Sequence, residues 1–161
     1  RQMVNGVSFF HKQGYLHMDV SFENFLFDEK GNVKLCDFGM AMAYRENIKC
    51  TRTLGKPRYM APEVVMGGEL SFKTDVFSLG VVLYSLITGI APYHSPSIND
   101  PYYCLIEKGN LVEVMINQKV KISTPAKHLL VNMICPASMR YTCKEEMEHP
   151  WLRPEKNRFI F

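Results

Sequence analysis

Residues 17–39 read HMDVSFENFLFDEKGNVKLCDFG, and this stretch decides the fold. It holds two short apolar runs, at 25–27 and 33–36, separated by the turn-forming sequence DEKGN. Such a pattern predicts a β-hairpin. Because a hairpin brings its two ends together, the polar residues that flank it, Asp19, Asn24 and Asp37, are expected to lie around one point.

These three side chains present the oxygen atoms that a hard cation prefers. Carboxylate and amide oxygens suit Mg²⁺ when the metal also bridges phosphate groups. One of the carboxylates could instead act as a base. Each residue alone is typical of an ordinary turn, so the indication of a site comes from their ordered combination around the hairpin.

The remainder of the chain predicts a mainly helical structure. Apolar residues at Met3, Val4, Val7 and Phe10 follow helical spacing. Residues 40–63 show no clear period and are expected to form a long ordered loop, a kind of segment that is often functional. Helical patterns follow from Phe72 onward, with a buried core helix at 76–87 and amphipathic segments near 100–116, 125–134 and 143–149.

Composition limits the classes of function. A length of 161 residues corresponds to one domain or part of one, and 47% hydrophobic with 22% charged residues excludes a disordered chain. The net charge of +3 comes from scattered basic residues, which does not indicate nucleic-acid binding. No apolar run reaches the ~20 residues of a membrane helix. Five cysteines without a C-x-x-C pair indicate reduced thiols and an intracellular, cytoplasmic location.

Further motifs follow the hairpin in a fixed order, and with them the sequence resembles the eukaryotic protein kinase superfamily, serine/threonine type. The His17 to Asn24 segment is similar to the catalytic loop of that family, and Asp37-Phe38-Gly39 to its metal-binding motif. The later matching stretches are GKPRYMAPE at 55–63, DVFSLG at 75–80, and Arg140 followed by HPWL at 149–152.

The resemblance covers nearly the whole chain and implies an α+β protein kinase-like fold. Only its mainly α-helical C-terminal lobe, with a small β-hairpin, is expected over residues 1–161. The glycine-rich loop G-x-G-x-x-G-x-V and the V-A-I-K lysine of the family are absent from this sequence. We therefore expect the 161 residues to require an N-terminal lobe and to be inactive without it.

The resemblance also implies roles for individual residues. Asp19 is the expected catalytic base, which accepts the proton of the substrate hydroxyl. Asn24 and Asp37 are expected to hold Mg²⁺, and Leu26 to lie beneath the adenine ring of ATP. Among structural residues, Asp75 is expected to accept hydrogen bonds from the catalytic-loop backbone.

Three further structural expectations follow from the resemblance. Glu63 and Arg140 are expected to form a buried ion pair. His17 and Phe38 are expected to stack in a hydrophobic column, which makes His17 a core residue. The other histidines, for which the sequence offers no partner, are interpreted as structural; they are His11, His94, His128 and His149.

Two departures from the family pattern concern the site. Ser21 stands where serine/threonine kinases usually carry lysine, and Lys56 stands where they usually carry threonine. We call residues 17–24 the first loop and residues 55–63 the second loop. We hypothesise that Lys56 is catalytic and that it supplies, from the second loop, the ammonium that the first loop lacks. The alternative is independent drift of the two positions. Met18 replaces an arginine that pairs with a phosphorylated loop in many kinases, and a thioether cannot make that pair.

Two classes of function compete at this point. The first is a serine/threonine protein kinase that uses ATP, Mg²⁺ and a protein substrate, with dual specificity left open. The second is a pseudokinase or scaffold, in which the fold serves as an interaction module. Retention of Asp19, Asn24 and Asp37 favours the enzyme.

Overall fold

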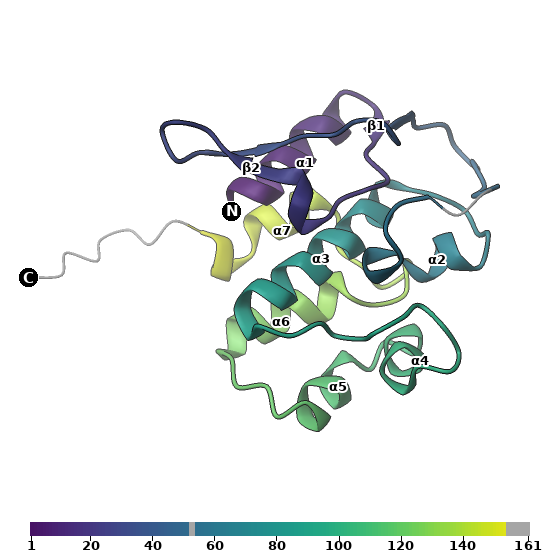
Figure 1. Ribbon diagram of the computed structural model, residues 1–161, viewed down its shortest axis with the longest axis vertical. Helices are drawn as coiled ribbons and strands as arrows, with labels where there is room; N and C mark the ends of the chain where they lie inside the picture. Colours follow the sequence, from purple (N-terminus) through teal and green to yellow (C-terminus); the bar gives the residue numbers. More distant parts are fainter. Residues whose placement is uncertain (52–53, 154–161) are drawn as a thin grey trace, which may run out of the picture.

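The computed structural model describes residues 1–51 and 54–153 (Figure 1). The chain opens with helix α1 (Gln2–Lys12), where the apolar spacing predicted a helix. Val4 and Val7 are buried on its inner side. Its neighbours in space include the hairpin and helix α7 (Cys143–Glu148), so α1 joins the beginning and the end of the described structure (Figure 1).

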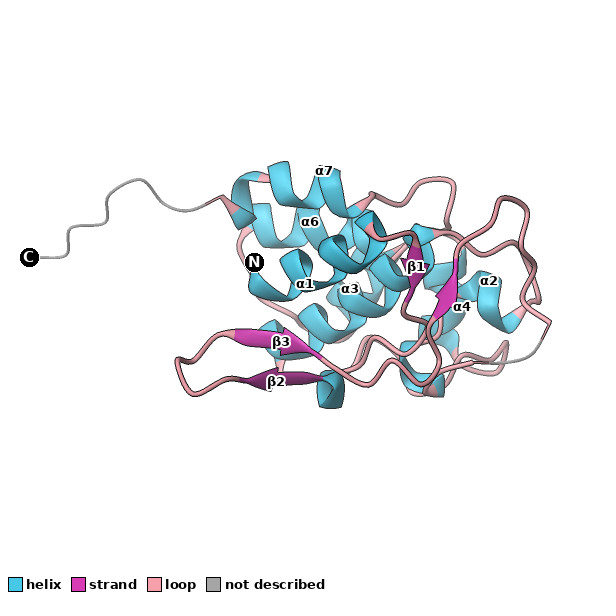
Figure 2. Ribbon diagram, turned by 90° about the horizontal axis from the view of Figure 1, so that it is seen from above, coloured by secondary structure: helices cyan, strands magenta, loops and turns pink. Residues whose placement is uncertain are grey.

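The predicted hairpin is confirmed. Strands β2 (Phe25–Phe27) and β3 (Val33–Leu35) are antiparallel, with Phe25 opposite Leu35 (Figure 2). The turn between them is closed by Asp28, whose Oδ1 accepts the backbone N–H groups of Lys30 and Asn32 at 2.9 and 2.8 Å. A short 3-10 helix, η1 (Phe22–Asn24), leads directly into β2. The hairpin thus begins and ends at the polar residues singled out in the sequence.

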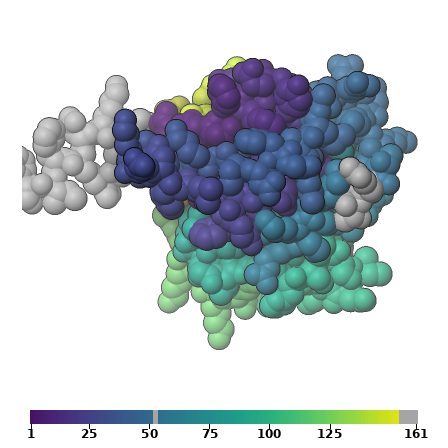
Figure 3. Space-filling view, turned by 45° about the horizontal axis from the view of Figure 1, so that its top comes forward, coloured from purple at the N-terminus to yellow at the C-terminus, as the bar shows by residue number. Residues whose placement is uncertain are grey.

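A second pair of strands was not predicted. Strand β1 (Tyr15–Leu16) pairs with β4 (Met42–Ala43) in antiparallel fashion. Each strand has two residues, too few for an alternating pattern to be recognised in the sequence. In Figure 3 the blue segments, which include the hairpin and the chain that follows it, form one surface between the purple N-terminal part of the chain and the green helices. The expected loop at 40–63 therefore contains β4, the 3-10 helix η2 (Pro57–Tyr59) and the short helix α2 (Pro62–Val65).

Helix α3 (Phe72–Thr88) is the buried core helix that the sequence predicted. Val76, Phe77 and Leu79 are fully or almost fully buried. Helix α6 (Thr124–Met133) crosses it closely at Gly80, where a Cβ atom would lie 2.8 Å from side-chain atoms of Met133 and Ile134. Because real Cβ contacts are longer than this, only glycine permits the observed packing.

The predicted amphipathic segment at 100–116 is wrong as a single helix. It forms two helices, α4 (Pro101–Glu107) and α5 (Leu111–Asn117), because the chain turns at Gly109, which has a φ of 75°.

Helix α7 (Cys143–Glu148) is capped by Thr142, whose Oγ1 accepts the N–H of Glu145, and the 3-10 helix η3 (Pro150–Leu152) follows. The described residues thus form the mainly helical fold with a small hairpin that was expected. Within them, no helix has the length and apolar character needed to cross a bilayer.

Candidate active site

The loop at 17–24, which resembles the catalytic loop of protein kinases, is anchored to the core helix by Asp75. This carboxylate in α3 is 1% exposed. Its Oδ2 accepts the backbone N–H of His17 at 2.8 Å and its Oδ1 accepts that of Met18 at 2.9 Å, as expected from the sequence. Met18 has a φ of 65°, a conformation that is costly for a residue with a side chain. The two hydrogen bonds stabilise this strained position, and the next residue is Asp19.

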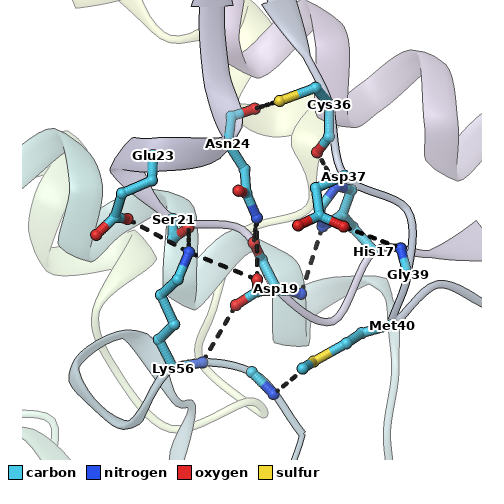
Figure 4. A network of polar contacts seen from close by, with 11 residues as sticks. His17, Asp19, Ser21, Glu23, Asn24, Cys36, Asp37, Gly39, Met40 and Lys56 are labelled. Atoms are coloured by element: carbon cyan, nitrogen blue, oxygen red, sulfur yellow. Dashed lines mark hydrogen bonds and ion pairs between the residues drawn. The ribbon is translucent and has the colours of Figure 1, made fainter.

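The carboxylate of Asp19 is oriented from two sides (Figure 4). Asn24 Nδ2 donates to Asp19 Oδ2 at 3.0 Å and to the Asp19 carbonyl oxygen at 2.7 Å. The backbone N–H of Lys56 donates to Asp19 Oδ1 at 3.2 Å. These hydrogen bonds hold the carboxylate in one direction. Asp19 is 9% exposed, so a small part of it still reaches solvent.

Asn24 and Asp37 lie at opposite ends of the hairpin and face the same region (Figure 4). Because Asn24 turns its amide nitrogen toward Asp19, its Oδ1 accepts no hydrogen bond from the described residues and can serve as a ligand. Asp37 is exposed, has a φ of 60°, and accepts the N–H of Gly39 through Oδ1 at 3.2 Å.

This donor set fits Mg²⁺ bound together with a phosphate-bearing ligand. Magnesium usually takes one or two protein oxygens and completes its shell with water and phosphate oxygens. Across residues 1–51 and 54–153 no three His, Cys, Asp or Glu side chains form a closed metal cage. One amide oxygen and one exposed carboxylate are an open arrangement of the kind that such a shared metal needs.

Lys56 reaches the same loop from the second loop of the site (Figure 4). Its Nζ donates to Ser21 Oγ at 2.7 Å and lies 3.6 Å from Asp19 Oδ2 and 3.5 Å from Glu23 Oε2. The structure therefore brings Lys56 and Ser21 together beside Asp19, as the exchange of residue types predicted. Backbone hydrogen bonding and then the Lys56 ammonium lower the pKa of Glu23. The side chain of Lys56 is 40% exposed, which leaves its ammonium accessible to an incoming anion.

Gly55 allows this close approach of the two loops. Its φ is 87°, and a Cβ atom there would lie 2.5 Å from the carbonyl oxygen of Met18. Its N–H donates to Met40 Sδ at 3.1 Å. A side chain at position 55 would therefore push Lys56 away from Asp19.

The aromatic contacts expected behind the site are present. The ring centroids of His17 and Phe38 are 5.4 Å apart, and Phe10 stacks on Phe38 at 5.0 Å. His17 is fully buried, and one of its ring nitrogens is 3.1 Å from the Cys36 carbonyl oxygen. These contacts make His17 a core residue. Leu26, by contrast, is 55% exposed.

The second loop is fixed at its far end by the predicted ion pair. Arg140 donates to Glu63 in bidentate fashion, with Nη1 2.6 Å from Oε1 and Nη2 3.0 Å from Oε2. The guanidinium also donates to the carbonyl oxygens of Lys73 and Cys135 and lies over the Phe77 ring. The Nε, Nη1 and Nη2 atoms of Arg140 thus all donate hydrogen bonds inside the protein.

Sequence reasoning missed the histidine partners. One ring nitrogen of His11, Nε2, lies 2.8 Å from Asp75 Oδ2, the same oxygen that accepts the N–H of His17. No spacing signal could have shown this, because the two residues are 64 positions apart. His128 and His149 also meet, with Nδ1 and Nε2 2.9 Å apart, and burial followed by the neighbouring His128 lowers the pKa of His149.

Comparison with known proteins gives a consistent result. The family model described as "Protein kinase domain" matches residues 1–152. Calcium-dependent protein kinase 8 of Oryza sativa subsp. japonica is 34% identical over 160 residues, which are 97% of this chain and 29% of the relative. The serine/threonine-protein kinase PEPKR2 of Arabidopsis thaliana is 34% identical over 149 residues, 91% of this chain and 31% of that protein.

A third relative is the calcium/calmodulin-dependent protein kinase type 1 of Caenorhabditis briggsae, which is 34% identical over 156 residues. The match covers 94% of this chain and 43% of that protein. The chain thus spans less than half the length of each of these three relatives.

Proposed function

The chain belongs to the protein kinase domain family, and on that premise we propose that the protein carrying it transfers the γ-phosphoryl group of ATP to a serine or threonine hydroxyl. The relatives named serine/threonine kinases support this acceptor. The observation that carries the proposal is the orientation of the Asp19 carboxylate by Asn24 and by the Lys56 backbone. Phosphoryl transfer depends on such positioning more than on covalent chemistry by the protein.

In the proposed reaction Asp19 is the catalytic base. It accepts the proton of the substrate hydroxyl as the new O–P bond forms and the bond between the γ-phosphorus and the leaving oxygen of ADP breaks. Asn24 donates to the oxygen Oδ2 of this carboxylate and Lys56 to Oδ1, so rotation of the carboxylate is restricted. The substrate oxygen thereby meets a base of fixed direction.

Asn24 and Asp37 would hold Mg²⁺, which when bound offsets the negative charge of the phosphate oxygens. The free Oδ1 of Asn24 and the exposed carboxylate of Asp37 support this assignment. Leu26 projects from β2 as an exposed apolar side chain and would support the adenine ring. These three residues form the part of the ATP site that this chain supplies.

Lys56 is proposed as the second catalytic residue. Its ammonium stands 3.6 Å from the carboxylate of the base and is accessible from solvent. Bound to a phosphate oxygen, it would stabilise charge that increases during transfer. Ser21 holds it in this position through the 2.7 Å hydrogen bond. The exchange of lysine and serine between the two loops therefore preserves one ammonium at the site.

Residues 1–161 are proposed to form the C-terminal lobe of a larger kinase domain. The sequence has no glycine-rich phosphate loop and no V-A-I-K lysine, so these parts must come from an N-terminal lobe. A groove of about 690 Å³ along α1 and β3 is lined by both apolar and polar side chains, and two of its aromatic residues, Phe9 and Phe38, are exposed. Exposed aromatic residues in a groove beside the ATP site support contact with another part of the domain.

The protein is proposed to act inside the cell, in the cytoplasm. ATP as co-substrate and the thiols of Cys36, Cys104, Cys135 and Cys143, which are not in disulfides, support this location.

The activity is tested with labelled ATP, Mg²⁺ and a generic serine/threonine substrate on the full-length protein. Transfer that is lost in Asp19→Asn, and absent from residues 1–161 alone, supports the proposal. For Lys56 the comparison is Lys56→Ala against Lys30→Ala, which removes an equal charge from the exposed turn of the hairpin. We expect at least a ~100-fold loss of kcat for Lys56→Ala and no change for Lys30→Ala.

Unchanged turnover in Lys56→Ala would contradict the role of this lysine while leaving that of Asp19 intact. Absence of both transfer and Mg-ATP binding in the full-length protein would instead assign the fold to a pseudokinase or scaffold.

A further inference from the structure

The second loop is attached to the core of the protein through two consecutive carbonyl groups. Ser78 in α3 donates its hydroxyl to the carbonyl oxygen of Tyr59 at 2.7 Å. Tyr93, in the segment that follows α3, donates its hydroxyl to the carbonyl oxygen of Met60 at 3.2 Å. A carbonyl group carries no proton, so the hydroxyl is the donor in both hydrogen bonds. Two neighbouring peptide groups of the loop are therefore held from outside it.

The backbone of residues 55–60 makes few other polar contacts. Among the described residues, no backbone–backbone hydrogen bond joins this segment to another part of the chain. Its internal hydrogen bonds close the turn η2 on itself, and in one of them the N–H of Tyr59 donates to the carbonyl oxygen of Lys56 at 3.0 Å. The N–H of Lys56 in turn donates to Asp19. The turn thus lies between the two hydroxyl donors and the proposed base, and hydrogen bonds connect it to both.

The hydroxyl of Tyr93 is a donor of fixed position. Tyr93 is 1% exposed, and burial raises the pKa of its hydroxyl above the usual value, so the group keeps its proton at neutral pH. Gln118 Nε2 donates to the carbonyl oxygens of the two residues before Tyr93, at 3.0 and 3.4 Å. Asp100 Oδ2 accepts the N–H groups of the two residues after it, at 2.7 and 3.0 Å. The backbone on both sides of Tyr93 is therefore held in place.

The interior beside the turn leaves little room for a water molecule that could replace this donor. The hydrogen bond between Tyr93 and Met60 is buried. A cavity of about 10 Å³ lies between the two loops and α3, and its lining includes Tyr59, Met60 and Ser78. This volume is at the lower limit for one water molecule. Loss of the Tyr93 hydroxyl would therefore leave the Met60 carbonyl without its donor, and the turn would have to move to regain one.

We propose that Tyr93 is a positioning residue for the second loop, acting through the carbonyl oxygen of Met60. The turn held in this way places Lys56 beside Asp19. The effect on turnover rests on the proposed kinase function, whereas the state of the Met60 carbonyl group can be measured without activity. Tyr93→Phe removes one oxygen atom and keeps the ring. Tyr103→Phe is the matched control: this ring packs on that of Tyr93 at 5.1 Å and is equally buried, and its hydroxyl has no hydrogen-bond partner among the described residues.

The first readout is the NMR signal of the Met60 carbonyl group in the full-length protein. Labelling of methionine carbonyls with ¹³C and of alanine with ¹⁵N selects peptide groups in which alanine follows methionine. Within this chain these are 40–41, 42–43 and 60–61. We expect Tyr93→Phe to move the ¹³C shift of the 60–61 group and to leave the other two groups in place, because only Met60 loses a donor. Tyr103→Phe should leave all three in place.

The second readout is steady-state kinetics of the same proteins with ATP and a generic serine/threonine substrate. We expect Tyr93→Phe to lower kcat roughly fivefold with KM for ATP unchanged, because the turn shifts relative to Asp19 while the residues proposed to bind ATP keep their positions. Tyr103→Phe should match the wild type. Urea unfolding of both variants checks that the kinetic difference does not come from loss of folded protein.

Two results would overturn the proposal: a 60–61 signal that does not move in Tyr93→Phe, or equal kcat values for Tyr93→Phe and Tyr103→Phe in a protein that transfers phosphate. If the wild type shows no phosphoryl transfer while the 60–61 signal responds as expected, the proposed activity fails and the attachment of the second loop by Tyr93 stands. The two hypotheses are therefore separated by one pair of variants.

Discussion

Glu146 offers the sharpest test of the energetics of this fold. Its side chain is 0% exposed, and among the described residues its carboxyl group has only the weak thiol donor of Cys143 beside it. Burial raises its pKa from 4.5 to about 8. The folded protein therefore keeps the proton of Glu146 over a range of pH in which the unfolded chain releases it.

The sign of the pH dependence follows directly. Below pH 4.5 both states are protonated, and Glu146 makes no pH-dependent difference. As the pH rises toward 8, the unfolded state gains stability from ionisation and the folded state does not, so the free energy of unfolding falls. At about 1.4 kcal/mol per pH unit, the loss from this group reaches roughly 3 kcal/mol at pH 7.

Glu146→Gln removes the ionisable group at nearly constant volume. Urea unfolding at pH 5, 6, 7 and 8 should show that the wild type loses ~1.4 kcal/mol per unit more than the variant does. Glu148→Gln is the control, because it makes the same change at an exposed position of the same helix. Parallel pH profiles for wild type and Glu146→Gln would refute the argument from burial.

Three further predictions concern the loops and the ion pair. Gly55→Ala should lower kcat by at least ~10-fold and also lower Tm, because a Cβ atom 2.5 Å from the Met18 carbonyl at a φ of 87° strains the loop and displaces Lys56 from Asp19; kinetics and calorimetry check this. Glu63→Ala should lower the unfolding free energy by about 3 to 5 kcal/mol by leaving the buried Arg140 unpaired, whereas replacement of both partners by apolar residues should cost less; urea unfolding of the wild type and the two variants decides. Asp37→Asn should weaken Mg²⁺-dependent nucleotide binding with unchanged unfolding free energy, since this side chain is exposed; isothermal calorimetry with and without Mg²⁺ measures it.

The parts of the fold that could be predicted are those encoded in local order. The hairpin followed from two apolar runs and a turn, and α3 from a long apolar segment. The pairing of Glu63 with Arg140 could be expected only through the family resemblance, because 77 residues separate them. The division of residues 100–116 into two helices was missed although the sequence marks the turn with Gly109, at a φ of 75°, and with Asn110, whose side chain caps α5.

The missed residues share a physical reason. Glu146 lies in the sequence KEEME, which is typical of an exposed helix, and its burial results from packing against a helix at the other end of the chain. His11 has no carboxylate near it in the sequence, yet it contacts Asp75. Polar groups that are buried by tertiary contact leave no periodic signal, so such residues become visible only when the elements are assembled.

The contacts of Lys56 couple the second loop to Asp19, the proposed base. The backbone N–H of Lys56 holds Asp19 Oδ1, and its ammonium lies near Oδ2. Displacement of this loop would thus remove one restraint from the carboxylate and the nearby positive charge together. Met18 is buried and offers no cation that could pair with a phosphate on the second loop. The position of the second loop beside Asp19 therefore depends on the close packing at Gly55 and on the ion pair of Glu63 with Arg140. A change in either anchor should therefore alter kcat through Asp19 even though neither residue would touch ATP.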